Sequence, residues 1–98
     1  MKAILIDPTQ RELRGIEVQS HELSAAFGAK KILLLTKMIG WHNVLYHDGL
    51  GSISACFWFE GVRSRINGKA LLLGRDKGKW PVSTTMTVKD VECLVKFV

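Results

Sequence analysis

Four strand-like segments joined by short, glycine-containing links constrain the fold of this chain more than any other feature. They cover residues 31–37, 41–46, 53–59 and 69–73, and no helical pattern separates them. Short links favour antiparallel neighbours, because a parallel crossover needs about a dozen residues or more. The segments therefore predict an antiparallel meander.

Two stretches within these segments are apolar on both faces of the strand. Residues 32–35 and 70–73 contain no polar side chain, which is typical of strands that are central in a sheet or covered on both sides. Two further strands are expected earlier in the chain, at residues 3–6 and at residues 14–19, where apolar and charged positions alternate.

Two short helices are expected beside the sheet. The first runs from an N-cap at Ser20 to a stop at Gly28. The second begins at Thr87, whose spacing to Asp90 is that of a capping box, and continues with helical spacing to Val98. The β-branched content of this tail argues weakly for a strand, but the period favours a helix.

These elements predict a single α+β domain over residues 1–98, with an antiparallel sheet of five or six strands and two short helices, one after the second strand and one at the C-terminus. Two small helices cover only part of such a sheet. Its remaining apolar face is expected to include some of Trp41, Phe57, Trp58 and Phe59. A second copy of the chain would cover that face, so we expect a homodimer; a sheet that curls into a partial barrel is an equal alternative.

The positive charge of the chain is confined to one segment. Residues 63–79 carry six basic side chains against one acid, Asp76, so the segment has a net charge of +5, which is that of the whole chain. Residues 1–62 carry six basic and six acidic side chains, and residues 80–98 carry two of each. Local positive charge acts on partners by steering and by neutralising phosphate. The candidate ligand-binding residues are Arg63, Arg65, Lys69, Arg75, Lys77, Lys79 and Trp80.

Residues 74–80 (GRDKGKW) fit a phosphate-bearing ligand, either a nucleic acid or a nucleotide. Glycines let backbone amides approach a phosphate, the cations neutralise it, and Trp80 could stack on a base. The same residues fit a solvated hairpin tip in which lysines maintain solubility and Trp80 packs on the sheet edge. This plainer interpretation is slightly favoured.

No pattern of catalytic or metal-binding residues stands out, so we expect a protein that is not an enzyme and holds no cofactor or metal. His42 and His47 are an odd number of positions apart, which sends them to opposite faces of a strand. Cys56 lies in an apolar strand with no histidine placed by the sequence to activate it. Cys56 and Cys93 are both expected to be reduced and buried.

The aromatic residues of the third segment could also stack bases. Phe57 and Phe59 share one face of the strand, and Trp58 faces the other. No lysine or arginine alternates with them within the strand. Core packing is therefore favoured over a nucleic-acid platform.

Three parts of the chain, residues 2–8 (KAILIDP), 66–76 (INGKALLLGRD) and 87–91 (TVKDV), resemble small phage and plasmid proteins that are classified as a domain of unknown function. The resemblance spans most of the chain in order. It implies a mobile-element origin and an α+β domain, and it supplies no catalytic residues.

The apolar run at residues 3–6 is too short for a signal peptide, and nothing approaches the ~20 apolar residues of a membrane span. We therefore expect a protein of the host-cell cytoplasm with no membrane partner. Its expected function is that of a phage or mobile-element accessory protein that binds a nucleic acid or nucleotide through residues 63–79. An inhibitor or adaptor of a host or defence protein is the alternative.

Overall fold

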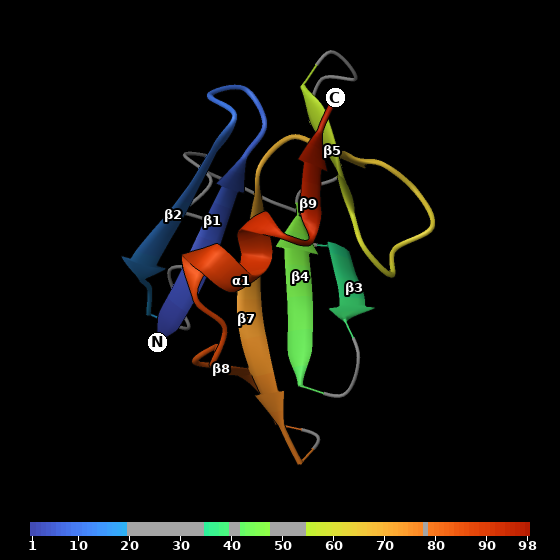
Figure 1. Ribbon diagram of the computed structural model, residues 1–98. Helices are drawn as coiled ribbons and strands as arrows, with labels where there is room; N and C mark the ends of the chain where they lie inside the picture. The colour runs from blue at the N-terminus through green and yellow to red at the C-terminus, as the bar shows by residue number, and fades with distance from the viewer. Residues whose placement is uncertain (20–34, 40–41, 48–54, 78) are drawn as a thin grey trace.

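Two antiparallel sheets organise the computed structural model, which describes residues 1–19, 35–39, 42–47, 55–77 and 79–98 (Figure 1). The larger sheet has six strands; five follow the order β2-β1-β7-β4-β3, and β8 pairs with β7. Each described strand pair is antiparallel, as the short links predicted. The strands of this sheet are β1 (Lys2–Asp7), β2 (Glu12–Glu17), β3 (Leu35–Ile39), β4 (Asn43–His47), β7 (Ala70–Asp76) and β8 (Lys79–Val82).

The smaller sheet has three strands in the order β6-β5-β9, and it packs on one face of the larger sheet. These strands are β5 (Cys56–Phe59), β6 (Ile66–Asn67) and β9 (Val95–Phe97). The one helix among the described residues, α1 (Val88–Glu92), packs on the same face and lies in front of β1 and β7 in Figure 1. The core between the layers contains Ile4, Ile6 and Leu72 from the larger sheet and Phe57 and Phe59 from the smaller one.

β7 lies at the centre of the larger sheet, between β1 and β4, and buries both of its faces. Leu71 and Leu73 belong to a cluster on one side of the sheet. Ala70 and Leu72 belong to the core on the other side, and all four side chains are fully buried. The apolar stretch at residues 70–73 therefore has the central position that its composition predicted.

The C-terminal segment begins as the sequence predicted and ends differently. The capping box is confirmed, since the Thr87 hydroxyl accepts from the backbone N–H of Asp90 at 3.1 Å and the Asp90 carboxylate accepts from the backbone N–H of Thr87 at 2.9 Å. The helix ends at Glu92, and Val95–Phe97 forms β9 against β5. The predicted continuation to Val98 is wrong because the β-branched tail gains a full ladder with β5.

The predicted α+β fold with one sheet and two helices is also wrong. The described residues are mainly in β-strands, and these strands divide between two packed sheets. The predicted meander holds for β3 and β4, but β4 then pairs with β7, and β5 joins the smaller sheet. The sequence analysis missed β6, β8 and β9, which are too short for an alternating pattern to stand out. The expected first helix at residues 20–28 lies outside the described residues, as do residues 32–34.

The aromatic residues of β5 divide between the core and the surface. Phe57 is 0% and Phe59 1% exposed, which confirms core packing, whereas Trp58 is 42% exposed. The larger sheet of the same chain therefore covers the two phenylalanines, and they no longer argue for a second copy. Trp41 lies outside the described residues. The homodimer stays a prediction, to be tested by light scattering.

The two cysteines differ in environment. Cys56 is buried and Cys93, at the C-cap of α1, is exposed, and both are free thiols. The expectation that both are buried is therefore wrong for Cys93, because the helix ends there and turns it to solvent. The described part of the chain contains no helix long and apolar enough to cross a membrane.

Candidate functional site

The basic segment at residues 63–79 is divided by the fold. β7 occupies its middle, so Lys69 lies before one end of the strand and Lys77 follows the other. Lys69 and Lys77 are eight positions apart, and an extended chain of that length spans about 25 Å, so these two lysines lie far from each other. Arg63 and Arg65 lie elsewhere, in the connection between β5 and β6. The predicted ligand-binding residues therefore occupy three places rather than one.

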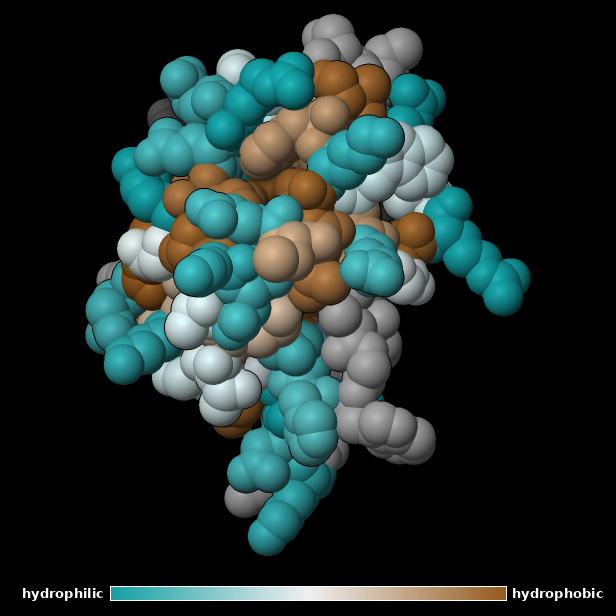
Figure 2. All heavy atoms as spheres, viewed as in Figure 1, coloured by the Kyte–Doolittle hydropathy of each residue, from teal (hydrophilic) through white to brown (hydrophobic). Residues whose placement is uncertain are grey.

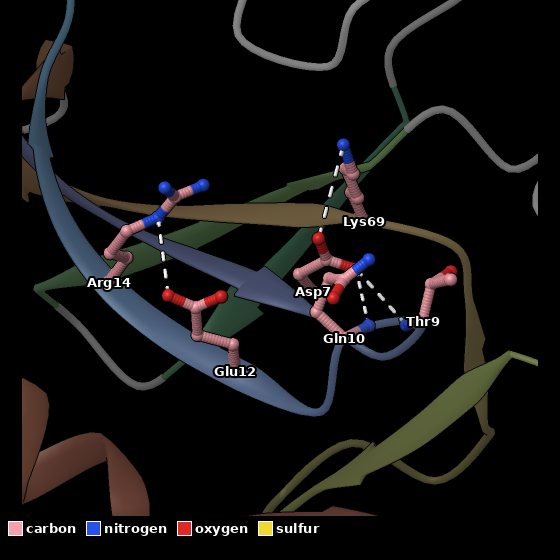
Figure 3. Close-up of polar contacts among 6 residues, drawn as sticks. All are labelled: Asp7, Thr9, Gln10, Glu12, Arg14 and Lys69. Carbon is pink, nitrogen blue, oxygen red and sulfur yellow. Dashed lines mark hydrogen bonds and ion pairs between the residues drawn. The ribbon is translucent and has the colours of Figure 1, made fainter.

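Lys69 faces a buried carboxylate in the structure. Its Nζ lies 4.0 Å from Oδ2 of Asp7, whose side chain is only 7% exposed (Figure 3). Oδ1 of Asp7 accepts from the backbone N–H groups of Thr9 and Gln10 at 3.0 and 3.2 Å, which closes the turn after β1. A lysine that compensates a buried charge has a structural role, so we leave Lys69 out of the proposed site.

Arg75 and Lys77 lie at the end of the β7–β8 hairpin. Asp76 pairs with Lys79, which leaves a two-residue connection, and Lys77 adopts the left-handed conformation with φ of 48° that such connections require. The Lys77 side chain is exposed. The side chains of Lys79 and Trp80 lie outside what the structure describes.

A cavity of about 260 Å³ opens at the base of this hairpin. Its walls come from three parts of the chain: the start of β4, the end of β7, and β8 with the residues that follow it. The lining residues are His42, Arg75, Asp76, Val82, Ser83 and Thr85.

Backbone contacts hold these walls together. The N–H of Arg75 donates to the carbonyl of His42 at 2.7 Å, continuing the β4–β7 ladder. The segment after β8 is held to β1, since the Lys2 N–H donates to the Ser83 hydroxyl and the Thr84 N–H to the Lys2 carbonyl, both at 2.9 Å. On β7, Gly74 leaves the room that the Ser83 backbone occupies. The cavity is therefore positioned by backbone contacts between separate parts of the fold.

Most of the polar groups that line the cavity favour an anion, and one of them, the Asp76 carboxylate, opposes it. Arg75 offers a fork of N–H donors, His42 offers an imidazole N–H, and Ser83 and Thr85 offer hydroxyls. Asp76 contributes a carboxylate, which opposes an anion, although its side chain is exposed and Lys77 follows it directly. The arrangement can hold a phosphate; it presents no nucleophile paired with a base.

The other residues considered for chemistry do not gather. His42 is exposed beside β4 whereas His47 is buried at the end of that strand, and Asp48 lies outside the described residues. Among the residues that the structure describes, no three metal-ligating side chains come together. A second cavity, of about 330 Å³, lies between β1, β2 and the start of α1, and Ile16, Met86 and Val88 contribute to its largely apolar wall.

The sequence analysis did not predict that His42, Ser83 and Thr85 line the same cavity as Arg75. His42 lies more than thirty positions from Arg75 in the chain, and only the pairing of β4 with β7 makes them neighbours. The only local signal was the polar run that follows Pro81.

Comparison of the chain with models of protein families, with curated proteins and with solved structures found no match. The resemblance to phage and plasmid proteins therefore stays a prediction.

Proposed function

We propose that the protein is a non-enzymatic binding protein whose ligand carries phosphate, as a nucleic acid or nucleotide does, and that the β7–β8 hairpin is the principal site. The observation that carries this proposal is the cavity at the hairpin base, which has Arg75 and His42 in its wall. The exposed Lys77 comes directly after Asp76, another residue of the cavity wall. Guanidinium and ammonium groups next to hydroxyl donors are the groups that bind phosphate in proteins.

The distribution of charge supports the same site. Residues outside 63–79 have no net charge, and Lys69 within this segment faces Asp7. The other basic side chains of the segment lie on the hairpin and on the Arg63–Arg65 connection. Positive charge concentrated on projecting elements raises the encounter rate with a polyanion and releases counterions on binding.

A protein inhibitor or adaptor that covers an acidic surface of a host protein is the second candidate. The observation that favours it is the separation of the two cationic places, because a broad acidic surface would meet both. In either case the resemblance noted above leads us to propose an accessory role in a phage or other mobile element.

Titration of labelled single-stranded DNA, duplex DNA and ATP, each over a range of salt concentrations, tests the proposal. The variant Arg75→Gln/Lys77→Asn removes two hairpin cations, and asparagine suits the left-handed conformation of residue 77. If both residues contact phosphate, the salt slope should fall by about 1.8 on duplex DNA or about 1.4 on a single strand.

Arg14→Gln/Lys89→Gln is the matched control, since it removes the same charge from exposed positions outside the segment. Equal loss in both double variants would mean a general charge effect and would contradict the hairpin site. Absence of binding to all three ligands, together with a nuclease-resistant complex captured from host lysate, would favour the protein-partner candidate.

A further inference from the structure

The outward face of the smaller sheet carries a large aromatic side chain that the fold leaves in solvent. Trp58 is 42% exposed, whereas Phe57 and Phe59 on either side of it are buried in the core. Its strand, β5, is paired on both edges, to β6 and to β9, so the indole stands on a well-supported backbone. A large exposed aromatic on a rigid strand is more informative than a scattered surface residue.

A cation lies near Trp58 on each side of β5. Lys96 of β9 is its direct partner in the register. On the other side Phe57 pairs with Ile66, the first residue of β6, and Arg65 immediately precedes that strand. Ile66 is buried in the core, whereas Arg65 is exposed.

Both cations are available to a ligand. Arg65 and Lys96 are exposed, and neither side chain has a hydrogen bond or ion pair with any residue in the described part of the chain. Adjacent strands lie about 4.8 Å apart, so a ligand about 10 Å wide spans β5 and the strands on both sides of it. The acidic residue Glu60 follows β5, and Arg63 lies three positions after it in the next connection.

We infer that this row, Arg65–Trp58–Lys96, is a stacking platform for single-stranded nucleic acid. A base laid on the indole would place the phosphates on either side of it near the two cations. A duplex suits the row less well, because its bases are stacked on one another and present no free face. The sequence analysis argued against such a platform because no cation alternates with the aromatics within β5. The cations come instead from β9 and from the residue that precedes β6.

This inference rests on the proposed function, because it specifies the ligand as a single strand, but it uses a different surface from the hairpin. The two can therefore fail separately. The probe is labelled oligothymidylate, compared with a duplex of the same length. We expect the wild-type protein to prefer the single strand.

Trp58→Leu should weaken binding of the single strand by about tenfold to a hundredfold and leave the salt slope unchanged, since stacking carries no charge. Trp58→Phe, which keeps an aromatic face, should lose less. Arg65→Gln/Lys96→Gln should lower the salt slope by about 1.4 on the single strand. Arg14→Gln/Lys89→Gln is again the control, and thermal unfolding verifies that each variant is folded.

If Trp58→Leu binds with wild-type affinity and Arg75→Gln/Lys77→Asn loses binding, the platform is overturned and the hairpin site is supported. The reverse pattern would support the platform alone. A preference for the duplex, or a concentration-dependent dimer that Trp58→Leu abolishes, would overturn the platform. Wild-type protein that binds no nucleic acid would overturn it, and if ATP is not bound either the proposed function fails with it.

Discussion

Gly74 and Ser83 are packed backbone to backbone: a Cβ atom on residue 74 would overlap the carbonyl oxygen of Ser83. Gly74 pairs with Val82, and the ladder is irregular between Gly74 and Asp76. This contact brings the segment after β8 against β7 and so forms one wall of the cavity at the hairpin base. The absence of a side chain at residue 74 is therefore a condition for the candidate site.

Gly74→Ala should destabilise the protein by about 1–3 kcal/mol, because the obstructing atoms belong to backbone and cannot turn away. Gly15→Ala is the control, since the nearest atom to a Cβ there is Cγ2 of Val88 at 3.9 Å. That replacement should be neutral or stabilise by up to about 1 kcal/mol. Urea unfolding measures both, and a Gly74→Ala protein as stable as the wild type would contradict the packing described.

The capping box predicts a pH-dependent contribution from Asp90. Hydrogen bonds with Thr87 lower the pKa of Asp90 below its ordinary value. The bond from the Thr87 backbone has the larger effect, and the bond with the Thr87 side chain the smaller one. The unfolded state therefore binds more protons than the folded state at acid pH. The ionised Asp90 carboxylate stabilises the fold fully above its unfolded pKa of about 3.9, and this stabilisation is lost as the pH falls through the folded pKa. The stability difference between wild type and Asp90→Asn should therefore narrow below about pH 4.

Thr87→Ala removes the other half of the capping box and should cost about 1 kcal/mol of stability at neutral pH. Val98→Ala, at an exposed position outside the helix, serves as a comparison. Equal stability of Thr87→Ala and wild type in urea would show that α1 is held by the packing of Val88 and Val91 and not by its cap.

The buried carboxylate of Asp7 should matter more for the turn that it closes than for its ion pair. Asp7→Ala leaves two backbone N–H groups without their acceptor and should cost about 1–3 kcal/mol, whereas Asp7→Asn keeps an acceptor oxygen and should cost less. Lys69→Gln should cost less than about 1 kcal/mol, because the lysine is 40% exposed and its ion pair is long. The same variant should bind DNA with nearly unchanged affinity; a loss as large as that of Arg75→Gln/Lys77→Asn would return Lys69 to the site.

The two thiols should react at different rates. Cys93 is exposed and should be labelled rapidly by a thiol reagent in the native protein, whereas Cys56 should react only as fast as the protein opens. Mass spectrometry over time, with Cys93→Ser as the single-thiol control, distinguishes them. Rapid labelling of both residues in the folded protein would contradict the burial of Cys56.

Several elements could be predicted because their causes are local. The capping box of Thr87 and Asp90 is complete within one helical turn, and the apolar stretch at residues 70–73 needs no knowledge of its neighbours to be read as a strand buried on both faces. The alternation in β5 also separated Phe57 and Phe59 from Trp58 correctly.

The amino-acid sequence by itself therefore determined that β1, β4, β5 and β7 are strands with a buried face, where α1 begins, and where the positive charge lies along the chain. Only the tertiary structure decided that residues 95–97 leave the helical pattern to pair with β5, that Arg75 lies beside His42, and that Lys96 is paired with Trp58. These outcomes depend on pairings between distant segments, in which the free energy of burying a sheet face outweighs local preference and the entropy of closing the intervening loops. A charge count along the chain cannot contain that information, which is why one basic segment became separate surfaces in the fold.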